Sequence, residues 1–426
     1  MNLKKTGIWC FSTYLAEGLP FGIIRLLSSI FFTDIGLKER YLGYLNFLGI
    51  PWNLKFLWAP LLDIIGTKRT WMIIIQSLIS ILVAAISLSC FSAAGQMDPS
   101  WFIAVIAGTF VILAFLSATN DIAIDGYYME GLTDPKEQAA YTGYRVFAYR
   151  VAIVLVRSGF VALAALATAR FGDADPYRPW GVAFAAAALT MSLITLFHMR
   201  HLPRFEQERT GRSVNVIFRD FGRAFASYFE QEKVILVIIF IIMYKIGDEI
   251  LFSMGTPFLM RELGVTKAQL SWLGGILGAL GTIAGTSIGG IWIKKKGLKK
   301  AIWPLTILMN FNIWAYVWLA WSRPQADTAS GLAVIAAVHT YEQMAAGLGN
   351  AVLLVYLLRT CKPEFKASHY AVGSAIMSLF STLFGGFGGL IVEQMGYLNM
   401  FIMAFCASIP AMALMFWVPI REEGSP

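Results

Sequence analysis

The chain has 426 residues, of which 57% are hydrophobic and 14% are charged, and its mean hydropathy is +0.64. A soluble domain carries roughly 25% charged residues. This chain has too few to cover a water-facing surface, which excludes a soluble, disordered, coiled-coil or small disulfide-linked protein. Together with 38 glycines and 14% aromatic residues, the composition indicates a helical integral membrane protein.

Apolar segments long enough to cross a bilayer recur along the chain. About 20 helical residues span the hydrocarbon core. We predict twelve membrane-spanning helices, near residues 7–32, 41–62, 71–93, 101–124, 143–168, 179–200, 234–259, 268–292, 301–321, 331–358, 370–392 and 397–419. Eleven spans are the alternative, because Pro51 and Lys55 weaken the second run. The first run is too long for a signal peptide and is expected to remain as span 1.

The basic residues predict how the chain is oriented. With the N-terminus on the cytoplasmic side, the inner segments hold roughly three times as many Lys and Arg residues as the outer loops, a bias that marks the cytoplasmic side. We therefore predict that both termini are cytoplasmic. The same bias accounts for the net charge of +8 without a nucleic-acid partner.

The longest polar segment divides the chain into two halves. We predict an N-terminal six-helix bundle over residues 1–200, a cytoplasmic linker over residues 201–233 and a C-terminal six-helix bundle over residues 234–426. Hydrophobic residues recur in the linker at helical spacing: Val214, Phe218, Phe221 and Phe225. This pattern predicts an amphipathic helix on the inner leaflet, with a flexible tether as the alternative.

A short, Gly-containing basic turn follows the second span of each half. The first turn contains Asp63, Gly66, Lys68 and Arg69, and the second runs over residues 294–300. Parallel repeats of six spans are typical of the major facilitator architecture, and the first turn resembles the loop motif of that superfamily. The resemblance implies that these four residues of the first turn form a gating loop.

Six acidic residues fall within the predicted spans: Glu17, Asp121, Asp125, Asp248, Glu249 and Glu342. An ionisable side chain at mid-membrane costs about 2.5–3.5 kcal/mol on insertion scales, so such residues are expected to have a function. They lie on spans 1, 4, 7 and 10, which line the central cavity in the major facilitator fold. We interpret them as proton-coupling residues, and the alternative is that each only neutralises a neighbouring cation.

Two of these sites carry a more specific pattern. Asp121 and Asp125 are four residues apart and share a helix face, and two neighbouring carboxylates suit a proton-binding site. Pairing with Arg145 and Lys136 is the alternative. Glu17 lies where a proline interrupts span 1, and opened backbone is tolerated where the freed groups line a cavity.

Six further residues of the predicted spans are assigned to substrate binding: Arg25, Arg150, Arg157, Lys245, His339 and Asn120. Arg150 and Arg157 are seven residues apart and share a helix face, and guanidinium groups suit a carboxylate or phosphate of the substrate. The alternative is that the two arginines neutralise Asp121 and Glu17.

The second half holds a cation close to two acids. Lys245 precedes Asp248 and Glu249 by three and four residues, so we expect one acid to pair with it and the other to remain for protons or substrate. His339 lies three residues before Glu342 and is either a proton relay or a hydrogen-bonded packing residue.

The sequence contains no pattern that supports a metal or a nucleotide cofactor. HExxH and phosphate-loop lysine motifs are absent, and the four cysteines have no CxxC spacing. Gly281, Gly285 and Gly289 recur every four residues inside an apolar span, which indicates close helix packing. We expect neither a cofactor nor a bound metal.

Three stretches of the first half resemble a narrower group of transporters. Residues 51–63 resemble the second-span signature of the peptide, acetyl-CoA and drug transporter branch of the major facilitator superfamily, and residues 118–126 resemble its fourth-span motif with paired aspartates. Residues 144–150 resemble the fifth-span arginine segment of AmpG-type muropeptide permeases. The sequence departs from the AmpG pattern at Asn120, where glutamine is usual, and at Glu17.

The resemblance implies proton-driven import of anhydro-muropeptides through the bacterial inner membrane, with an important fourth-span aspartate whose role falls on Asp121 and Asp125. We expect a monomeric secondary transporter whose partners are an anionic small molecule, protons and the lipid bilayer. Siderophore import, drug export and sodium coupling are alternatives. A membrane acyltransferase with His339 as base is a remote one, because the surroundings of this histidine are apolar.

Overall fold

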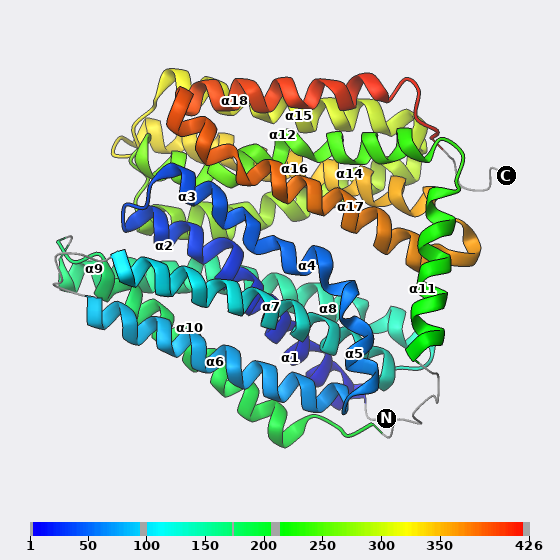
Figure 1. Ribbon diagram of the computed structural model, residues 1–426. Helices are drawn as coiled ribbons and strands as arrows, with labels where there is room; N and C mark the ends of the chain where they lie inside the picture. The colour runs from blue at the N-terminus through cyan, green and yellow to red at the C-terminus, as the bar shows by residue number, and fades with distance from the viewer. Residues whose placement is uncertain (1–2, 94–99, 173, 206–213, 421–426) are drawn as a thin grey trace. The chain divides into compact units, whose positions relative to one another are not determined.

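Helices account for the secondary structure of the described residues (Figure 1). The computed structural model describes residues 3–93, 100–172, 174–205 and 214–420, and no strand occurs in these ranges. The first half forms α1 (Leu3–Gly22), η1 (Ile23–Leu27), α2 (Ser28–Asp34), α3 (Glu39–Tyr44), η2 (Leu45–Gly49), α4 (Ile50–Leu54), η3 (Lys55–Leu57), α5 (Ala59–Ile64), α6 (Lys68–Ala93), α7 (Ser100–Gly131), α8 (Pro135–Val154), η4 (Leu155–Phe160), α9 (Val161–Phe171) and α10 (Tyr177–His201). The second half forms α11 (Val214–Phe229), α12 (Val234–Arg261), α13 (Lys267–Leu270), η5 (Ser271–Leu277), α14 (Gly278–Lys296), α15 (Leu298–Ser322), α16 (Ala329–Thr360), η6 (Pro363–Phe365), α17 (Lys366–Gly386) and α18 (Gly388–Leu414).

Many of these helices have the length and composition of membrane spans. Among the described residues, eight helices are long and apolar enough to cross a bilayer, including Thr6–Asp34, Trp101–Gly131 and Leu298–Ser322. The remaining predicted spans coincide with α12, α16, α17 and the segmented region from α3 to α5. Inside α18, Gly396 has a φ of 78°, so the last predicted span begins after this residue.

The second predicted span is not one continuous helix, which corrects the expectation for residues 41–62. It consists of α3, η2, α4, η3 and α5 in succession. Pro51 and Pro60 lack the N–H that a helix needs and disfavour helical geometry in the preceding residue. Leu54, between α4 and η3, leaves the helical region with a φ of −103° and a ψ of 0°.

Within the described part of the chain, three of the spans contain a π-helical segment, namely η1, η4 and η5. Such segments are rare and occur most often at functional sites, because the wider turn redirects side chains. Arg25 lies in η1 and Arg157 lies in η4. Two of the residues assigned to substrate binding therefore lie on irregular helix.

The chain forms two compact units, and each contains a segment from the other half of the sequence. Unit 1 comprises Met1–Ile35, Leu54–Val214 and Lys267–Gly275, and unit 2 comprises Gly36–Asn53, Asn215–Thr266 and Ile276–Pro426. The segment 36–53 thus packs with the C-terminal helices, and the segment 267–275 packs with the N-terminal ones.

Ion pairs fix both exchanged segments within their units. In unit 2, Arg261 Nη1 lies 2.6 Å from Glu39 Oε1. Arg40 donates from Nε and Nη2 to the two carboxylate oxygens of Glu393, each at 2.7 Å. In unit 1, Lys267 Nζ lies 2.8 Å from Asp34 Oδ2.

The core of unit 1 is rich in aromatic rings. Trp9 on α1 meets Tyr127 of α7 edge to face, with ring centroids 5.3 Å apart, and Tyr14 meets Tyr128 in the same way at 5.8 Å. All four side chains are buried. These contacts fix α1 against α7, the two helices that carry Glu17, Asp121 and Asp125.

In unit 2, glycines bring α14 against α16. A Cβ on Gly285 would lie 1.9 Å from the main-chain oxygen of Met344, and one on Gly281 would lie 2.8 Å from that of Thr340. The backbones approach this closely only because no side chain intervenes, which confirms the packing predicted from the four-residue glycine spacing.

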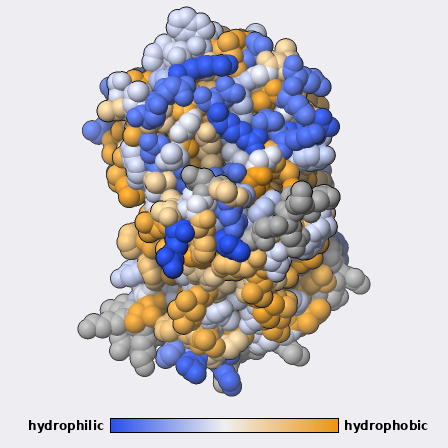
Figure 2. Space-filling model, turned by 90° about the vertical axis from the view of Figure 1, so that its left-hand side faces the viewer, coloured by the Kyte–Doolittle hydropathy of each residue, from blue (hydrophilic) through white to orange (hydrophobic). Residues whose placement is uncertain are grey.

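Large apolar side chains cover much of the outer surface. Trp321 and Phe416 are each 73% exposed, and Ile235 is 72% exposed. Figure 2 shows one face of the molecule, on which hydrophobic residues (orange) are exposed among hydrophilic ones (blue). Extensive apolar exposure of this kind suits contact with lipid.

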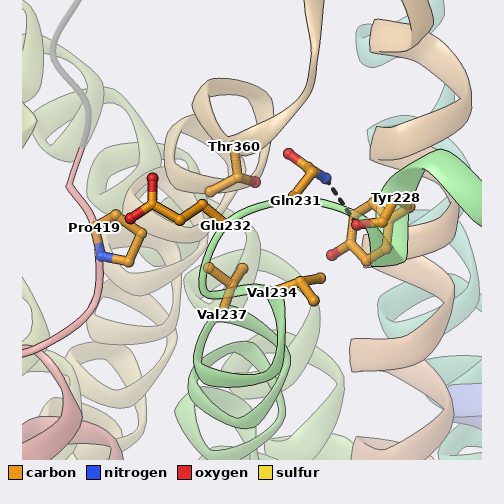
Figure 3. Close-up of a pocket in the computed structure, with 7 residues that line it drawn as sticks. All are labelled: Tyr228, Gln231, Glu232, Val234, Val237, Thr360 and Pro419. Atoms are coloured by element: carbon orange, nitrogen blue, oxygen red, sulfur yellow. Dashed lines mark hydrogen bonds between the residues drawn. The ribbon is translucent and has the colours of Figure 1, made fainter.

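A helix forms in the linker, as its sequence pattern predicts. The helix α11 ends at Phe229, and close to this end Ser227 Oγ lies 2.7 Å from His369 Nε2. Figure 3 shows Tyr228 and Gln231 beside a pocket of about 10 Å³ that Val234 and Thr360 also line. Three of the four hydrophobic side chains named for this helix lie outside the described ones, and Phe225 is exposed.

Candidate functional site

In unit 1, three acidic side chains and two cations form one cluster. Lys55 of η3 lies with its Nζ 2.6 Å from Oδ2 of Asp121 on α7. Asp125 lies one helical turn after Asp121 on α7, and its Oδ1 is 2.9 Å from Nη2 of Arg145 on α8. Two of the acids therefore have cationic partners, each supplied by a different element.

Arg145 is enclosed by aromatic rings as well as paired. Its Cζ lies 4.4 Å from the ring centroids of both Tyr14 and Tyr128. The Tyr14 hydroxyl also donates a 2.7 Å hydrogen bond to Asp125 Oδ1. Because cation–π contacts and a charged hydrogen bond act together, this guanidinium has a fixed orientation towards Asp125.

Glu17 is the third carboxyl group of the cluster. It interacts electrostatically with Asp121, Asp125 and Lys55, and its side chain approaches that of Asp121 closely enough for a hydrogen bond. Its Oε2 is buried and has no hydrogen-bond partner among the described residues. A hydrogen bond between two carboxyl groups requires that one of them carries a proton.

The residues of the predicted gating loop have distinct structural roles. Gly66 has a φ of +70°, which glycine adopts at little cost. Lys68 is buried against Gly126 of α7, where a Cβ would lie 2.7 Å from its Cε. Arg69 donates to the carbonyl oxygens at the end of α10, at 2.7 Å to Met199 and 3.2 Å to Leu202. The side chain of Asp63, also predicted there, lies outside the described ones.

The arginines assigned to substrate binding lie apart from the two ion pairs just described. Arg25 and Arg150 interact electrostatically with Tyr149 of α8, as do Glu17 and Asp121. Arg157 is buried against Gly274 of the exchanged segment, where a Cβ would lie 2.8 Å from its Nη2. Asn120 is fully buried with its amide hydrogen-bonded on both sides.

Unit 2 holds a second cluster, formed by α12 and α16. Lys245 and Asp248 form an ion pair, which is the local pairing that their spacing predicts. Lys245 Nζ also donates to Asn350 Oδ1 at 3.3 Å, and it interacts electrostatically with Glu249 and Glu342.

His339 and Glu342 are both buried on α16. The Nδ1 of His339 lies 3.0 Å from the Tyr316 hydroxyl and 3.5 Å from Glu342 Oε2. The same carboxylate oxygen accepts a 2.7 Å hydrogen bond from Gln343 Nε2. The acids on spans 7 and 10 are therefore gathered in one unit, as those on spans 1 and 4 are in the other.

Sequence reasoning missed several members of these clusters. Tyr14 and Tyr128 enclose Arg145, yet aromatic residues are so frequent in this chain that no pattern singled them out. Lys55 was treated as a weakness of span 2, although a lysine inside an apolar span is itself a sign of a buried partner. Among the described residues, no group of three or more His, Cys, Asp or Glu side chains could hold a metal ion.

Comparisons with known proteins agree with this architecture. The family model described as acetyl-coenzyme A transporter 1 matches residues 11–166. An uncharacterized protein of Haemophilus influenzae is 27% identical and covers 98% of this chain and 95% of its own length. The anhydromuropeptide permease of Escherichia coli strain K12 is 26% identical over 94% of this chain and 77% of its own length.

A solved structure extends the likeness to the fold. The D-xylose–proton symporter matches with a TM-score of 0.70 at 15% identity, covering 99% of both chains. This match confirms the predicted all-α fold of twelve membrane-spanning helices. The relatives whose names give an activity are a permease and a symporter, and not enzymes. The chain therefore has the fold of this symporter and is similar in sequence to the anhydromuropeptide permease and to other AmpG-type transporters.

Proposed function

We propose that this transporter is a proton-coupled importer of an anionic solute, with anhydro-muropeptides as the substrate class. The observation that carries the proposal is the contact between the Glu17 and Asp121 carboxyl groups beside Lys55. A carboxyl pair that shares a proton can load and release it as the surroundings change. The likeness to an anhydromuropeptide permease supports the substrate class.

Proton binding would act through the ion pairs of unit 1. Protonated Asp121 no longer attracts Lys55, and protonated Asp125 no longer holds Arg145, so each event removes one tether of α7 to another element. A ligand shifts a conformational equilibrium by its differential affinity for the two states. We propose that the proton is this ligand and that it favours one state of an alternating-access cycle.

Substrate binding would use cations other than Lys55 and Arg145. We propose that Arg25, Arg150 and Arg157 of unit 1 and Lys245 of unit 2 recognise negative groups of the solute, with His339 as a further polar contact. Glu249 and Glu342 would complete proton coupling in unit 2 together with Asp248. We also propose that the protein is a monomer of the bacterial inner membrane, with both termini cytoplasmic and the loop around Gly66 acting as a gate.

Uptake into proteoliposomes tests the coupling. An inward proton gradient should accelerate accumulation of labelled anhydro-muropeptide in the wild-type protein. Asp125→Asn should abolish the acceleration while exchange of substrate between the two sides continues, because exchange needs no net proton movement. Equal uptake with and without the gradient would contradict proton coupling, and a gradient of sodium tests the other coupling ion.

A second substrate has support from the family model, whose description names acetyl-coenzyme A. Acetyl-coenzyme A is also anionic, through its phosphates, and the arginines of unit 1 suit phosphates as well as carboxylates. Competition of unlabelled acetyl-coenzyme A against labelled anhydro-muropeptide separates the two. Inhibition by acetyl-coenzyme A together with its own gradient-driven uptake would favour the second substrate.

A further inference from the structure

Pro20 leaves one carbonyl of α1 without its helical partner. In a regular α-helix the N–H of residue 20 would donate to the carbonyl of residue 16, and proline has no N–H. In this structure the Nδ2 of Asn120, on α7, donates to Ala16 O at 3.0 Å. The asparagine therefore replaces the missing helix bond from a different helix.

The other side of the Asn120 amide begins a chain of buried hydrogen bonds that returns to α1. Gln76 Nε2 of α6 donates to Asn120 Oδ1 at 3.2 Å, and Gln76 Oε1 lies 2.7 Å from Nδ1 of His198 on α10. His198 Nε2 lies 3.1 Å from the Ser12 hydroxyl, one helical turn before Ala16. Asn120, Gln76 and His198 are each fully buried.

The unpaired carbonyl fixes the direction of every bond in this ring. Ala16 O can only accept, so the Asn120 group that faces it is the NH2 group and the group that faces Gln76 is the oxygen. Gln76 must then donate to Asn120, which leaves its own oxygen to accept from His198. His198 therefore carries its proton on Nδ1 when the imidazole is neutral. The Ser12 hydroxyl has one proton for two acceptors, His198 Nε2 at 3.1 Å and Trp9 O at 3.2 Å.

The ring holds together the two residues that precede the carboxyl pair. Ala16 is followed directly by Glu17, and Asn120 is followed directly by Asp121. One hydrogen bond thus joins the Asn120 side chain to the backbone of α1 beside these carboxyl groups, on a helix that Pro20 has interrupted. We propose that Asn120 is a positioning residue, which sets the relative placement of Glu17 and Asp121; the proposal rests on the proton coupling proposed above.

The test compares proton binding in matched variants of the full-length protein in liposomes. The infrared band of protonated carboxyl groups is followed from acidic to alkaline pH, which needs no substrate. Asn120→Leu should change the proton affinity of the carboxyl pair about tenfold, a shift of one pH unit. Asn120→Gln keeps the amide donor and acceptor, so its pH midpoint of carboxyl protonation should stay closer to that of the wild type than the midpoint of Asn120→Leu does.

A control and a double variant separate positioning from general destabilisation. Asn53 is a buried asparagine of unit 2 whose Nδ2 donates to Thr382 Oγ1 at 3.0 Å. Asn53→Leu should therefore lower the stability of the protein without moving the pH midpoint of carboxyl protonation. Pro20→Ala restores the N–H that Ala16 lacks. In that background Asn120→Leu should therefore move the midpoint much less than it does alone.

The outcomes distinguish this inference from the proposed function. An unchanged midpoint in Asn120→Leu, or an equal shift with and without Pro20→Ala, overturns the positioning role even if wild-type uptake responds to the proton gradient. Uptake that ignores the gradient overturns the proposed coupling, and the positioning role with it. A midpoint shift that Pro20→Ala suppresses supports the positioning role.

Discussion

Lys55 and Asp121 form an ion pair across 2.6 Å although 66 positions separate them in the sequence. The lysine lies in a short 3₁₀ segment of the broken second span, and the aspartate lies in the long helix α7. The pair therefore ties an irregular element to a regular one, and its loss affects both.

Removing either partner of this pair should destabilise the protein more than removing both. A single change to Lys55→Gln or Asp121→Asn leaves one poorly compensated charge in a protein interior, at a cost of about 1–3 kcal/mol. The double variant removes both charges of the pair, so the double-mutant cycle should show a coupling free energy of about 1 kcal/mol or more between Lys55 and Asp121. Thermal unfolding in detergent measures it, and additive single effects would show that the two side chains act independently.

Arg145 should not tolerate replacement by lysine. Arg145→Lys keeps the charge but loses the planar group that lies 4.4 Å from both tyrosine rings, so we expect a loss of about 1–2 kcal/mol in unfolding free energy. Tyr128→Phe is the comparison, because it keeps the ring and removes the hydroxyl, which donates to Gln138 O and also contacts Thr142 and Arg145. The lysine variant should therefore unfold at the lower temperature, and the reverse order would refute this role of the two rings.

Two glycines of α14 should respond oppositely to alanine. A Cβ on Gly285 would lie 1.9 Å from Met344 O, whereas one on Gly290 would meet nothing within 4 Å. Gly285→Ala must push α14 away from α16 and should cost about 1–3 kcal/mol. Gly290→Ala should gain up to about 1 kcal/mol from helix propensity. Equal melting temperatures for the two variants would contradict the close approach of these helices.

The Cys361 thiol should react slowly with alkylating reagents. It lies just after α16, and burial raises its pKa to about 11, an effect that the nearby Lys366 charge opposes. Because only the thiolate reacts, labelling at pH 8 should be roughly 100-fold slower than for a thiol with a pKa of 9, and its rate should climb until the pH passes 11. Peptide mass spectrometry follows the modification at this site.

The variant Lys366→Gln provides the control for that prediction. Loss of the positive charge removes the one influence that lowers the pKa of Cys361, so labelling at pH 8 should become slower still. Labelling at the rate of an ordinary exposed thiol would show that the site is open to water.

Two ion pairs of the site could be predicted from the sequence: Lys245 with Asp248, and, as the alternative to a proton site, Arg145 with an aspartate of α7. Lys245 and Asp248 are three apart, and helix geometry alone brings them together. Asp121 has a partner that no local pattern indicates. Lys136 was the cation considered beside Arg145, and the actual partner is Lys55, because the breaks at Pro51 and Pro60 decide where that lysine lies.

The positions of the spans could be predicted because hydropathy reports burial in lipid directly. Hydropathy does not report which helices pack together. The exchange of residues 36–53 and 267–275 between the units therefore has no signal in the sequence, although Asp34 and Lys267, which pair in unit 1, are both visible as charges at the ends of spans. The role of Asn120 was missed for the same reason, since its partner is a backbone atom of another helix.

The exchanged segments have a consequence for how the protein is made. Residues 36–53 leave the ribosome early, yet every other part of unit 2 is translated after residue 214. Until the rest of the polypeptide is inserted, Glu39 and Arg40 of this segment lie in the bilayer without their ion-pair partners Arg261 and Glu393. Because unit 2 is complete only when both stretches are present, we expect two separately expressed fragments to be degraded by membrane proteases unless both are made in the same cell.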